Sequence, residues 1–273
     1  MGDRQWNARR MQTYAAMVEQ MDRGIGRLLT MLDSAGAGDD TLVMFLSDNG
    51  GCAELMEEDG WPRFYPETNH DGTRVTPGNR TDLEPGGAGT FMSYDLPWAN
   101  ASNTPFRRFK HWVHEGGIST PLLARWPARL RGGVQGHEPA HVVDILPTIL
   151  EATGAAMPSE IGGSAVQAPD GESLLPALSG DDWQRQQPIF WEHEGNAAIR
   201  LGPWKLVRCH GRDWELYEMD EDRTELTDLA ARAPDRVAAL IDEWQGWADG
   251  IGVRDWTRLS AELQRQWGIS GDR

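Results

Sequence analysis

An acidic and an amide side chain stand together where an apolar segment of the chain ends. Asp48-Asn49-Gly50 directly follows a mostly apolar run, residues 41–47. Open α/β folds bind their ligands where strands leave the sheet. Carboxylate and amide oxygens suit a hard cation, Ca²⁺ or Mg²⁺. Asp48 and Asn49 are therefore predicted to bind a metal ion, although Ca²⁺ takes about 6 to 8 oxygens and these two residues supply only part of that shell.

The same residues have a second interpretation, because Asp-Gly and Asn-Gly are also common in hairpin turns of type I′. A hairpin needs a return strand with alternating apolar residues. Residues 51–58 do not alternate. The sequence thus favours a ligand role for Asp48 and Asn49 over a simple turn.

A second candidate group lies around a basic residue, Lys110. An isolated lysine is usually a solvated surface charge. Here Gly116-Gly117 follows shortly afterwards, and paired glycines let the backbone pass close to a ligand. His111 and His114 are ambiguous, because each could hydrogen-bond near a site or pack as a structural histidine. Together the two groups predict half of a metal-assisted site that hydrolyses an anionic ester.

The composition excludes several classes of function. A net charge of −16 and a pI near 4.8 argue against nucleic-acid binding, which needs clustered Lys and Arg. The two cysteines, Cys52 and Cys209, cannot form a disulfide framework and lie in no zinc-ligand spacing. No apolar stretch approaches the roughly 20 residues that span a bilayer. We therefore expect a soluble protein that binds neither nucleic acid nor membrane.

The elements that must position these residues alternate between helix and strand. Apolar residues recur at steps of three and four over residues 14–32, which predicts a helix. Residues 41–46 are apolar on both faces, which favours a buried parallel strand. A further strand is predicted at residues 121–126, and a helix at residues 145–153 with Asp144 as its cap. This order is typical of an α/β protein.

Residues 51–99 follow no sustained period and are rich in Gly, Pro, Asp and Glu. A segment this long without regular structure is a functional lid or is disordered. Its aromatic residues favour a lid, because disordered segments are poor in them.

Beyond Gly180 the pattern changes to short strands separated by turn residues. The candidates are residues 188–191, 197–201, 204–208 and 214–217. They predict an antiparallel meander. A helix at residues 234–247 has one apolar face and would lie across that sheet. We therefore divide the chain into an α/β part, residues 1–183, and a small α+β subdomain, residues 184–273.

These residues fall into an ordered series of motifs that strongly resembles the type I sulfatases, the arylsulfatase family. The resemblance extends to about Trp247. The matching motifs are Phe45-Leu46-Ser47-Asp48-Asn49-Gly50, Asn103-Thr104-Pro105-Phe106, Lys110 with Glu115-Gly116-Gly117-Ile118, Arg125-Trp126-Pro127, Asp144-Ile145-Leu146-Pro147-Thr148, Asp170-Gly171, Trp191-Glu192-His193-Glu194-Gly195, Trp204-Lys205-Leu206-Val207 and Glu215-Leu216-Tyr217.

The resemblance implies a fold class and a chemistry. The fold would be an α/β core like that of alkaline phosphatase, with its sheet between helices, followed by a four-stranded antiparallel sheet and a C-terminal helix. In such enzymes a formylglycine, made from Cys or Ser in a C/S-x-P-x-R motif, attacks the sulfur of a sulfate ester. A cation, Ca²⁺ in preference to Mg²⁺, orients the ester. By position Asp48 and Asn49 match two metal ligands, Lys110 matches a sulfate-binding lysine, and His114 is a further candidate for substrate binding.

The chain departs from the family pattern in one respect. Neither Cys52 nor Cys209 is followed by the Pro and Arg of the formylglycine motif. The remaining ligands of the family would precede Met1. We therefore expect the C-terminal part of a sulfatase, with its N-terminal half as the missing partner and formylglycine upstream. Truncation, a split gene product or a wrongly chosen start codon would each produce such a chain.

The predicted function is thus hydrolysis of a sulfuric ester, by a chain that is inactive alone. The alternatives are a phosphate- or phosphonate-ester hydrolase of the same superfamily and a noncatalytic anion-binding remnant. The substrate would be a small sulfate ester, aryl or steroid, or a sugar sulfate. The residues do not distinguish a cytoplasmic from a periplasmic location.

Overall fold

The computed structural model describes residues 3–56 and 67–267. The chain divides into two compact units, and each is built from two segments. The first unit comprises Met1–Ala35 and Ser47–Pro121, and the second comprises Gly36–Leu46 and Leu122–Arg273. This division differs from a boundary at residue 183, which stays a prediction.

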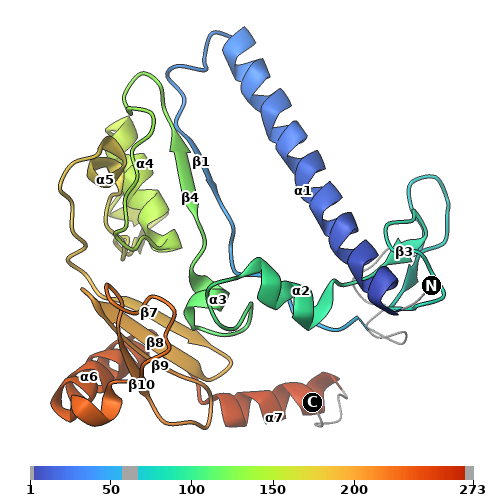
Figure 1. The fold of residues 1–273 in the computed structure, drawn as a ribbon. Helices are drawn as coiled ribbons and strands as arrows, with labels where there is room; N and C mark the ends of the chain where they lie inside the picture. The colour runs from blue at the N-terminus through green and yellow to red at the C-terminus, as the bar shows by residue number, and fades with distance from the viewer. Residues whose placement is uncertain (1–2, 57–66, 268–273) are drawn as a thin grey trace. The chain divides into compact units, whose positions relative to one another are not determined.

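A long helix, α1 (Asp3–Ser34), opens the first unit and contains the predicted helix 14–32 (Figure 1). Polar contacts near its start fix it to the same unit. The Trp6 indole donates to the Leu83 carbonyl at 2.9 Å, and the buried Arg10 donates to the Ser93 carbonyl at 3.0 Å. Further along, apolar side chains such as Met17 and Met31 are 65% and 68% exposed. None of the described helices is both long and apolar enough to cross a membrane.

The rest of the first unit contains short elements. β2 (Thr76–Pro77) and β3 (Thr90–Phe91) form a parallel pair, and the short helices α2 (Asp95–Ser102) and α3 (Glu115–Ile118) follow. The described residues of the predicted lid, 51–56 and 67–99, thus contain little regular structure, and its residues 57–66 lie outside the described part of the chain. The function of this segment stays a prediction.

In the second unit, β1 (Val43–Leu46) pairs with β4 (Leu122–Arg125). The pairing is antiparallel, with Val43 opposite Arg125. Both strands lie where the sequence predicts them, but the prediction of a parallel strand at residues 41–46 is wrong. The prediction that this strand is buried is also wrong, because its residues are only half-buried and Phe45 is 37% exposed. An apolar run does not encode strand direction, since parallel and antiparallel strands can both be apolar.

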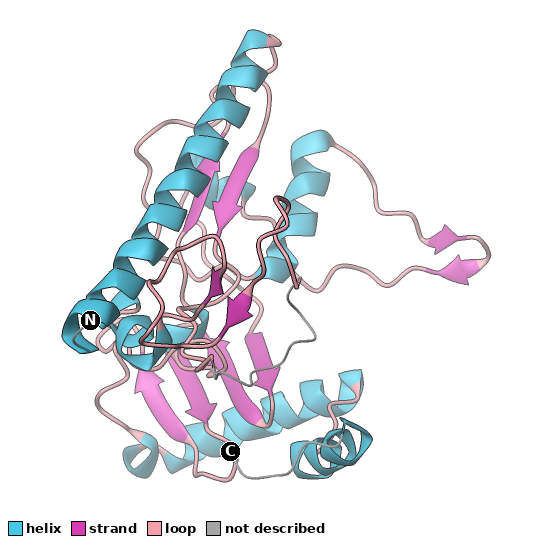
Figure 2. Ribbon diagram, turned by 90° about the vertical axis from the view of Figure 1, so that its right-hand side faces the viewer, coloured by secondary structure: helices cyan, strands magenta, loops and turns pink. Residues whose placement is uncertain are grey.

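Along the sequence, several elements follow β4 and precede the four-stranded sheet. They are η1 (Val142–Asp144), α4 (Ile145–Thr153), a small hairpin of β5 (Glu160–Ile161) and β6 (Ser164–Ala165), and α5 (Leu175–Ser179). The hairpin stands at the end of two long connections (Figure 2). Helix α4 has the predicted bounds and ends at Gly154, whose φ of 69° suits glycine.

Asp144 precedes α4 as predicted, but its side chain does not cap that helix. It accepts hydrogen bonds from the backbone N–H groups of His141 and Glu172 at 2.6 and 2.9 Å. It also forms a bidentate pair with Arg185, at 2.9 and 2.8 Å. Because Asp144 is fully buried, these donors offset the cost of removing its charge from water. The residue therefore joins three segments of the second unit.

The four-stranded antiparallel sheet is confirmed, with the order β10-β9-β8-β7. Its strands are β7 (Ile189–His193), β8 (Asn196–Leu201), β9 (Trp204–Arg208) and β10 (Glu215–Glu218). After η2 (Ala230–Arg232), helix α6 (Pro234–Ile251) packs its apolar face against the sheet (Figure 1). Leu240 and Trp244 of α6 belong to one hydrophobic cluster with the buried Ile199 and Leu206 of the sheet. A last helix, α7 (Trp256–Trp267), was not expected from the sequence.

Candidate functional site

Backbone hydrogen bonds in the first unit join the two candidate groups. The N–H of Gly50 donates to the Gly117 carbonyl at 3.0 Å, and the N–H of Lys110 donates to the Gly51 carbonyl at 2.9 Å. The Thr120 hydroxyl donates to the carbonyl of Ser47, the residue before Asp48, at 2.7 Å. The segment that carries the predicted metal ligands is therefore held against the segment that carries the predicted anion-binding lysine.

This close approach requires glycine at several positions. A Cβ atom at Gly50 would lie 1.8 Å from the Gly116 carbonyl oxygen. At Gly117 it would lie 1.9 Å from the Trp112 carbonyl oxygen. Real Cβ atoms do not approach backbone this closely, so any larger residue would push the two segments apart. The paired glycines thus serve backbone packing, and their approach to a ligand stays a prediction.

Asn103 connects the same segments through its side-chain amide. Its Oδ1 accepts from the Gly51 N–H at 2.8 Å, and its Nδ2 donates to the Arg108 carbonyl at 3.0 Å. Each is a backbone group that would otherwise need another partner. Asn103 therefore fixes the backbone on both sides of the candidate site. The sequence assigned it no role beyond its place in a motif.

Lys110 makes an ion pair that the sequence did not predict. Its Nζ lies 2.9 Å from Oε1 of Glu54, and the two side chains are 39% and 69% exposed. The hydrogen bond from Lys110 to Glu54 raises the pKa of the lysine, and the charges of Cys52, Glu54 and Asp48 add to this. The same hydrogen bond lowers the pKa of Glu54. Lys110 therefore remains protonated, and its charge interacts favourably with the Asp48 carboxylate.

Cys52 lies between these groups as a half-buried thiol. Burial raises its pKa, as does the nearby Glu54 carboxylate, while Lys110 acts in the opposite direction. A thiol with a raised pKa is a poor nucleophile, because the thiolate is the reactive form. Cys52 thus contributes packing and hydrogen bonding at this place.

The structure places the two candidate histidines differently. His114 is fully buried at the N-terminal end of α3, beside the buried Glu115. This burial suits the structural interpretation better than direct substrate contact, and the substrate role of His114 stays a prediction. His111 is half-buried and directly follows Lys110.

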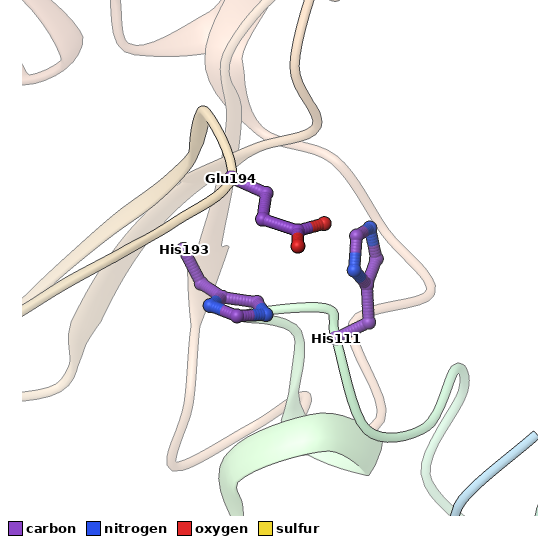
Figure 3. A group of neighbouring side chains, drawn as sticks. All are labelled: His111, His193 and Glu194. Carbon is purple, nitrogen blue, oxygen red and sulfur yellow. The ribbon is translucent and has the colours of Figure 1, made fainter. Parts of the chain in front are cut away.

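Figure 3 shows His111 together with His193 and Glu194. His111 belongs to the first unit, whereas the other two belong to the second, at the turn that joins β7 to β8. Glu194 adopts a left-handed backbone there, with φ at 52°. We therefore consider His111 with Lys110, and the other two residues with the four-stranded sheet.

The predicted metal ligands offer oxygen donors of the expected kind. Asp48 is exposed and Asn49 is half-buried. The backbone carbonyl of Asn49 accepts a hydrogen bond from the Ser47 hydroxyl at 3.0 Å, so the side chains are the groups that remain for a cation. A carboxylate and an amide fit a hard cation such as Ca²⁺ and supply a minor part of its shell. Their role as ligands stays a prediction.

The fold agrees with that of known sulfatases. The crystal structure of Ps i-CgsB in complex with k-i-k-neocarrahexaose matches 91% of this chain and 47% of that one, with a TM-score of 0.61 and 23% identity. This likeness defines the class by its fold alone, a mixed helix-and-sheet architecture shared with that structure.

Sequence comparison then gives the family. The sulfatase family model matches residues 2–155, and the model for the C-terminal part of N-sulphoglucosamine sulphohydrolase matches residues 106–243. The chain belongs to the sulfatase family. This confirms the resemblance drawn from its motifs.

Two curated relatives show the extent of the match. An uncharacterised sulfatase of Schizosaccharomyces pombe is 32% identical over 264 residues, which are 92% of this chain and 45% of the relative. The steryl-sulfatase of Mus musculus is 32% identical over 191 residues, 70% of this chain and 24% of the relative. The chain thus spans less than half the length of the curated relatives it matches.

Proposed function

We propose that this chain is the C-terminal part of a sulfuric ester hydrolase and supplies half of its active site. The observation that carries the proposal is the backbone pairing of Lys110 with Gly51, which holds the lysine beside the segment of Asp48 and Asn49. The lysine ammonium and a pair of oxygen ligands for a metal ion lie on adjoining segments. This arrangement suits an oxyanion that is bound between the lysine and the metal ion. Membership of the sulfatase family makes that oxyanion a sulfate ester.

Each residue has a definite role in this proposal. The Lys110 ammonium donates hydrogen bonds to a sulfate oxygen and offsets the negative charge of the ester in the transition state. The Asp48 carboxylate and the Asn49 amide oxygen hold part of the coordination shell of Ca²⁺. When bound, that cation would orient the ester and withdraw charge from its oxygens. The glycines and Asn103 keep these groups at a fixed separation.

A nucleophile would come from outside this chain. Neither cysteine lies in a C/S-x-P-x-R motif, and the pKa of Cys52 is raised by burial, which disfavours its thiolate. We therefore propose that formylglycine is supplied by a segment upstream of Met1. A chain without it binds the anion and does not turn it over.

The substrate class follows from the sulfate group that known relatives share. One relative is a steryl-sulfatase, and a structural neighbour binds a carrageenan oligosaccharide. We propose a sulfated small molecule or a sugar sulfate for this protein too. The aromatic residues of the 51–99 segment would contact the part of the substrate beyond the sulfate.

Extending the reading frame upstream of Met1 tests the proposal. We expect a C/S-x-P-x-R motif there, and hydrolysis of 4-nitrophenyl sulfate by the extended protein with Ca²⁺. Lys110→Ala should then lower kcat/KM by roughly 100-fold or more, as loss of a charge-stabilising donor does. The 273-residue chain should be inactive in the same assay.

Other results would favour the alternatives. Turnover of a phosphate or phosphonate ester, and none of a sulfate, would assign the chain to another hydrolase of this superfamily. An extended protein that neither turns over nor binds sulfate would be a noncatalytic remnant. Turnover by the 273-residue chain, abolished by Lys110→Ala, would refute the half-site.

A further inference from the structure

The Lys110 side chain makes a well-defined contact with Glu54. Nζ and Oε1 lie 2.9 Å apart, within hydrogen-bond distance of a charged pair. The two residues are 56 positions apart in the sequence. The side-chain contact adds to the backbone hydrogen bond from the Lys110 N–H to the Gly51 carbonyl at 2.9 Å. Lys110 is thus attached at two points to the loop that begins with Asp48.

A lysine side chain needs such an attachment to act at a defined place. Its four-carbon stem has many rotamers, and holding one of them costs up to about 2 kcal/mol of side-chain entropy. Lys110 keeps 39% of its side-chain surface exposed, so packing alone does not fix its ammonium. The ammonium carries three N–H donors. One of them meets Glu54, which leaves donors for a sulfate oxygen on the exposed side.

Glu54 is itself held close to this place. It contacts the thiol of the half-buried Cys52, and this contact lowers the pKa of the carboxyl. The charge of His111 also lowers the pKa of the Glu54 carboxyl. Glu54 therefore lies in a small network of the first unit, even though it is largely exposed. No role was assigned to it from the sequence.

We propose that Glu54 is the positioning residue for Lys110, holding its ammonium toward the Asp48–Asn49 segment so that it can receive a sulfate oxygen. The inference rests on the proposed function, because it assumes that Lys110 binds sulfate. It assigns Glu54 no contact with the reacting atoms. Two other roles make different predictions: Glu54 could occupy the sulfate position and leave it when substrate binds, or it could be a further ligand of the metal.

The composition of the chain makes a direct test feasible. Lys110 and Lys205 are its two lysines, and Lys205 is fully buried. An amine-acetylating reagent, read by peptide mass spectrometry, therefore reports on Lys110, while Lys205 reports on unfolding. The 273-residue chain is labelled with increasing sodium sulfate, with ionic strength held constant by sodium chloride. The variants are Glu54→Gln and, as a matched control, Glu84→Gln.

The control removes the same charge from a similar pair elsewhere in the first unit. Glu84 lies 2.9 Å from Arg9, and the two side chains are 60% and 48% exposed. We expect sulfate to protect Lys110 in the wild type and in Glu84→Gln. In Glu54→Gln, Lys110 should be labelled about two- to fivefold faster, as expected for loss of an exposed ion pair. Its protection should need at least twice as much sulfate, because the ammonium is no longer held in place.

The sign of the sulfate effect separates positioning from competition. Removing a carboxylate that blocked the site would make sulfate bind more tightly, so protection at lower sulfate in Glu54→Gln would overturn the proposal. A metal-ligand role would appear as a weaker Ca²⁺ affinity in calorimetry, whereas a positioning residue leaves Ca²⁺ affinity unchanged. If Glu54→Gln had a lower Tm but unchanged labelling of Lys110, Glu54 would contribute to stability only and would not position the lysine.

The two proposals also fail in different ways. Protection of Lys110 by sulfate in the wild type, with the same labelling and protection in Glu54→Gln, would refute the role of Glu54 alone. Absence of protection in the wild type, with and without Ca²⁺, would refute sulfate binding by Lys110. Both the proposed function and the positioning role of Glu54 would then be refuted, because the second depends on the first.

Discussion

The two lysines of this protein make ion pairs of similar geometry in very different surroundings. Lys110 lies 2.9 Å from Glu54 in the first unit, and Lys205 lies 2.8 Å from Glu225 in the second. The first pair is partly exposed, whereas both members of the second are fully buried. Water screens the first pair. The second pair has lost its hydration, and mutual attraction offsets that cost.

The difference shows how one residue type is used for two purposes. Lys205 lies in β9, and its ammonium is over the ring of Trp191, 6.0 Å from the ring centroid. It fixes a particular arrangement of the small sheet. Lys110 and Lys205 are the two lysines of the chain, and Lys205 is fully buried, so Lys110 is the one lysine with an accessible ammonium. A compact ammonium is a point-like donor suited to an anion that comes and goes.

The largest effect is expected from breaking the buried pair. Lys205→Ala leaves the Glu225 carboxylate buried without its cation, which costs about 3–5 kcal/mol. Urea unfolding of the chain should show this loss as a lower midpoint. Replacing both residues, Lys205→Met with Glu225→Leu, should recover most of the stability, since neither charge of this pair is then buried. If Lys205→Ala were as stable as the wild type, the predicted contribution of this pair to the free energy of unfolding would be refuted.

The next effect concerns the glycine contact that supports Lys110. In Gly117→Ala the new methyl group would lie 1.9 Å from the Trp112 carbonyl oxygen, so the segments must separate. Overpacking of this kind costs about 1–3 kcal/mol, and Lys110 labelling should lose its sulfate protection. Gly246→Ala is the control, because a Cβ there meets nothing within 4 Å. It should be neutral or stabilise helix α6 by up to about 1 kcal/mol. Equal melting of the two variants would contradict the prediction.

A smaller effect is expected for the exposed pair itself. Glu54→Gln should change the free energy of unfolding by less than about 1 kcal/mol, because solvent screens the contact. Its consequence should appear in sulfate binding rather than in the melting temperature. A loss in the free energy of unfolding comparable to that of Lys205→Ala would show that the exposed pair stabilises the fold as much as the buried pair. The two ion pairs would then not differ in their contribution to stability.

The smallest effect is the pH dependence of the exposed pair. The pKa of Glu54 is lowered from its ordinary value of 4.5, so its contribution is present above 4.5 and is lost as pH falls through the lowered value. The pKa of Lys110 is raised from 10.5, so its contribution is complete below 10.5 and is lost as pH rises through the raised value. The difference in stability between wild type and Glu54→Gln should therefore fall off below pH 4.5 and above pH 10.5, and molar salt should reduce it. A difference that is unchanged at both extremes of pH would contradict this assignment.

The regular elements were largely predictable from the sequence, for a local reason. The period of α1, the start and stop residues of α4 and the turn residues between β7 and β10 are local signals, and these elements are found where they were expected. Strand direction is not local: β1 meets β4 from the opposite direction, and no residue within β1 encodes that choice.

The candidate site shows the same limit. Asp48, Asn49 and Lys110 were found because their motifs resemble a family. Glu54 and Asn103 were missed because their partners lie 56 and 52 residues away. An exposed glutamate and a loop asparagine carry no local pattern that would single them out. Contacts of this kind become visible only when the chain is folded.

The pairing of β1 with β4 has a consequence for the order in which the protein can form during its synthesis. Val43 needs Arg125 opposite it, and the residues between these strands belong to the other unit. At about 5–20 residues per second, a ribosome takes roughly 4–16 s to deliver the second strand. During that interval an apolar strand has left the exit tunnel with nothing to pair with on its β4 side. A nascent chain paused before residue 122 should therefore be a good chaperone substrate, and one paused after β4 a poorer one.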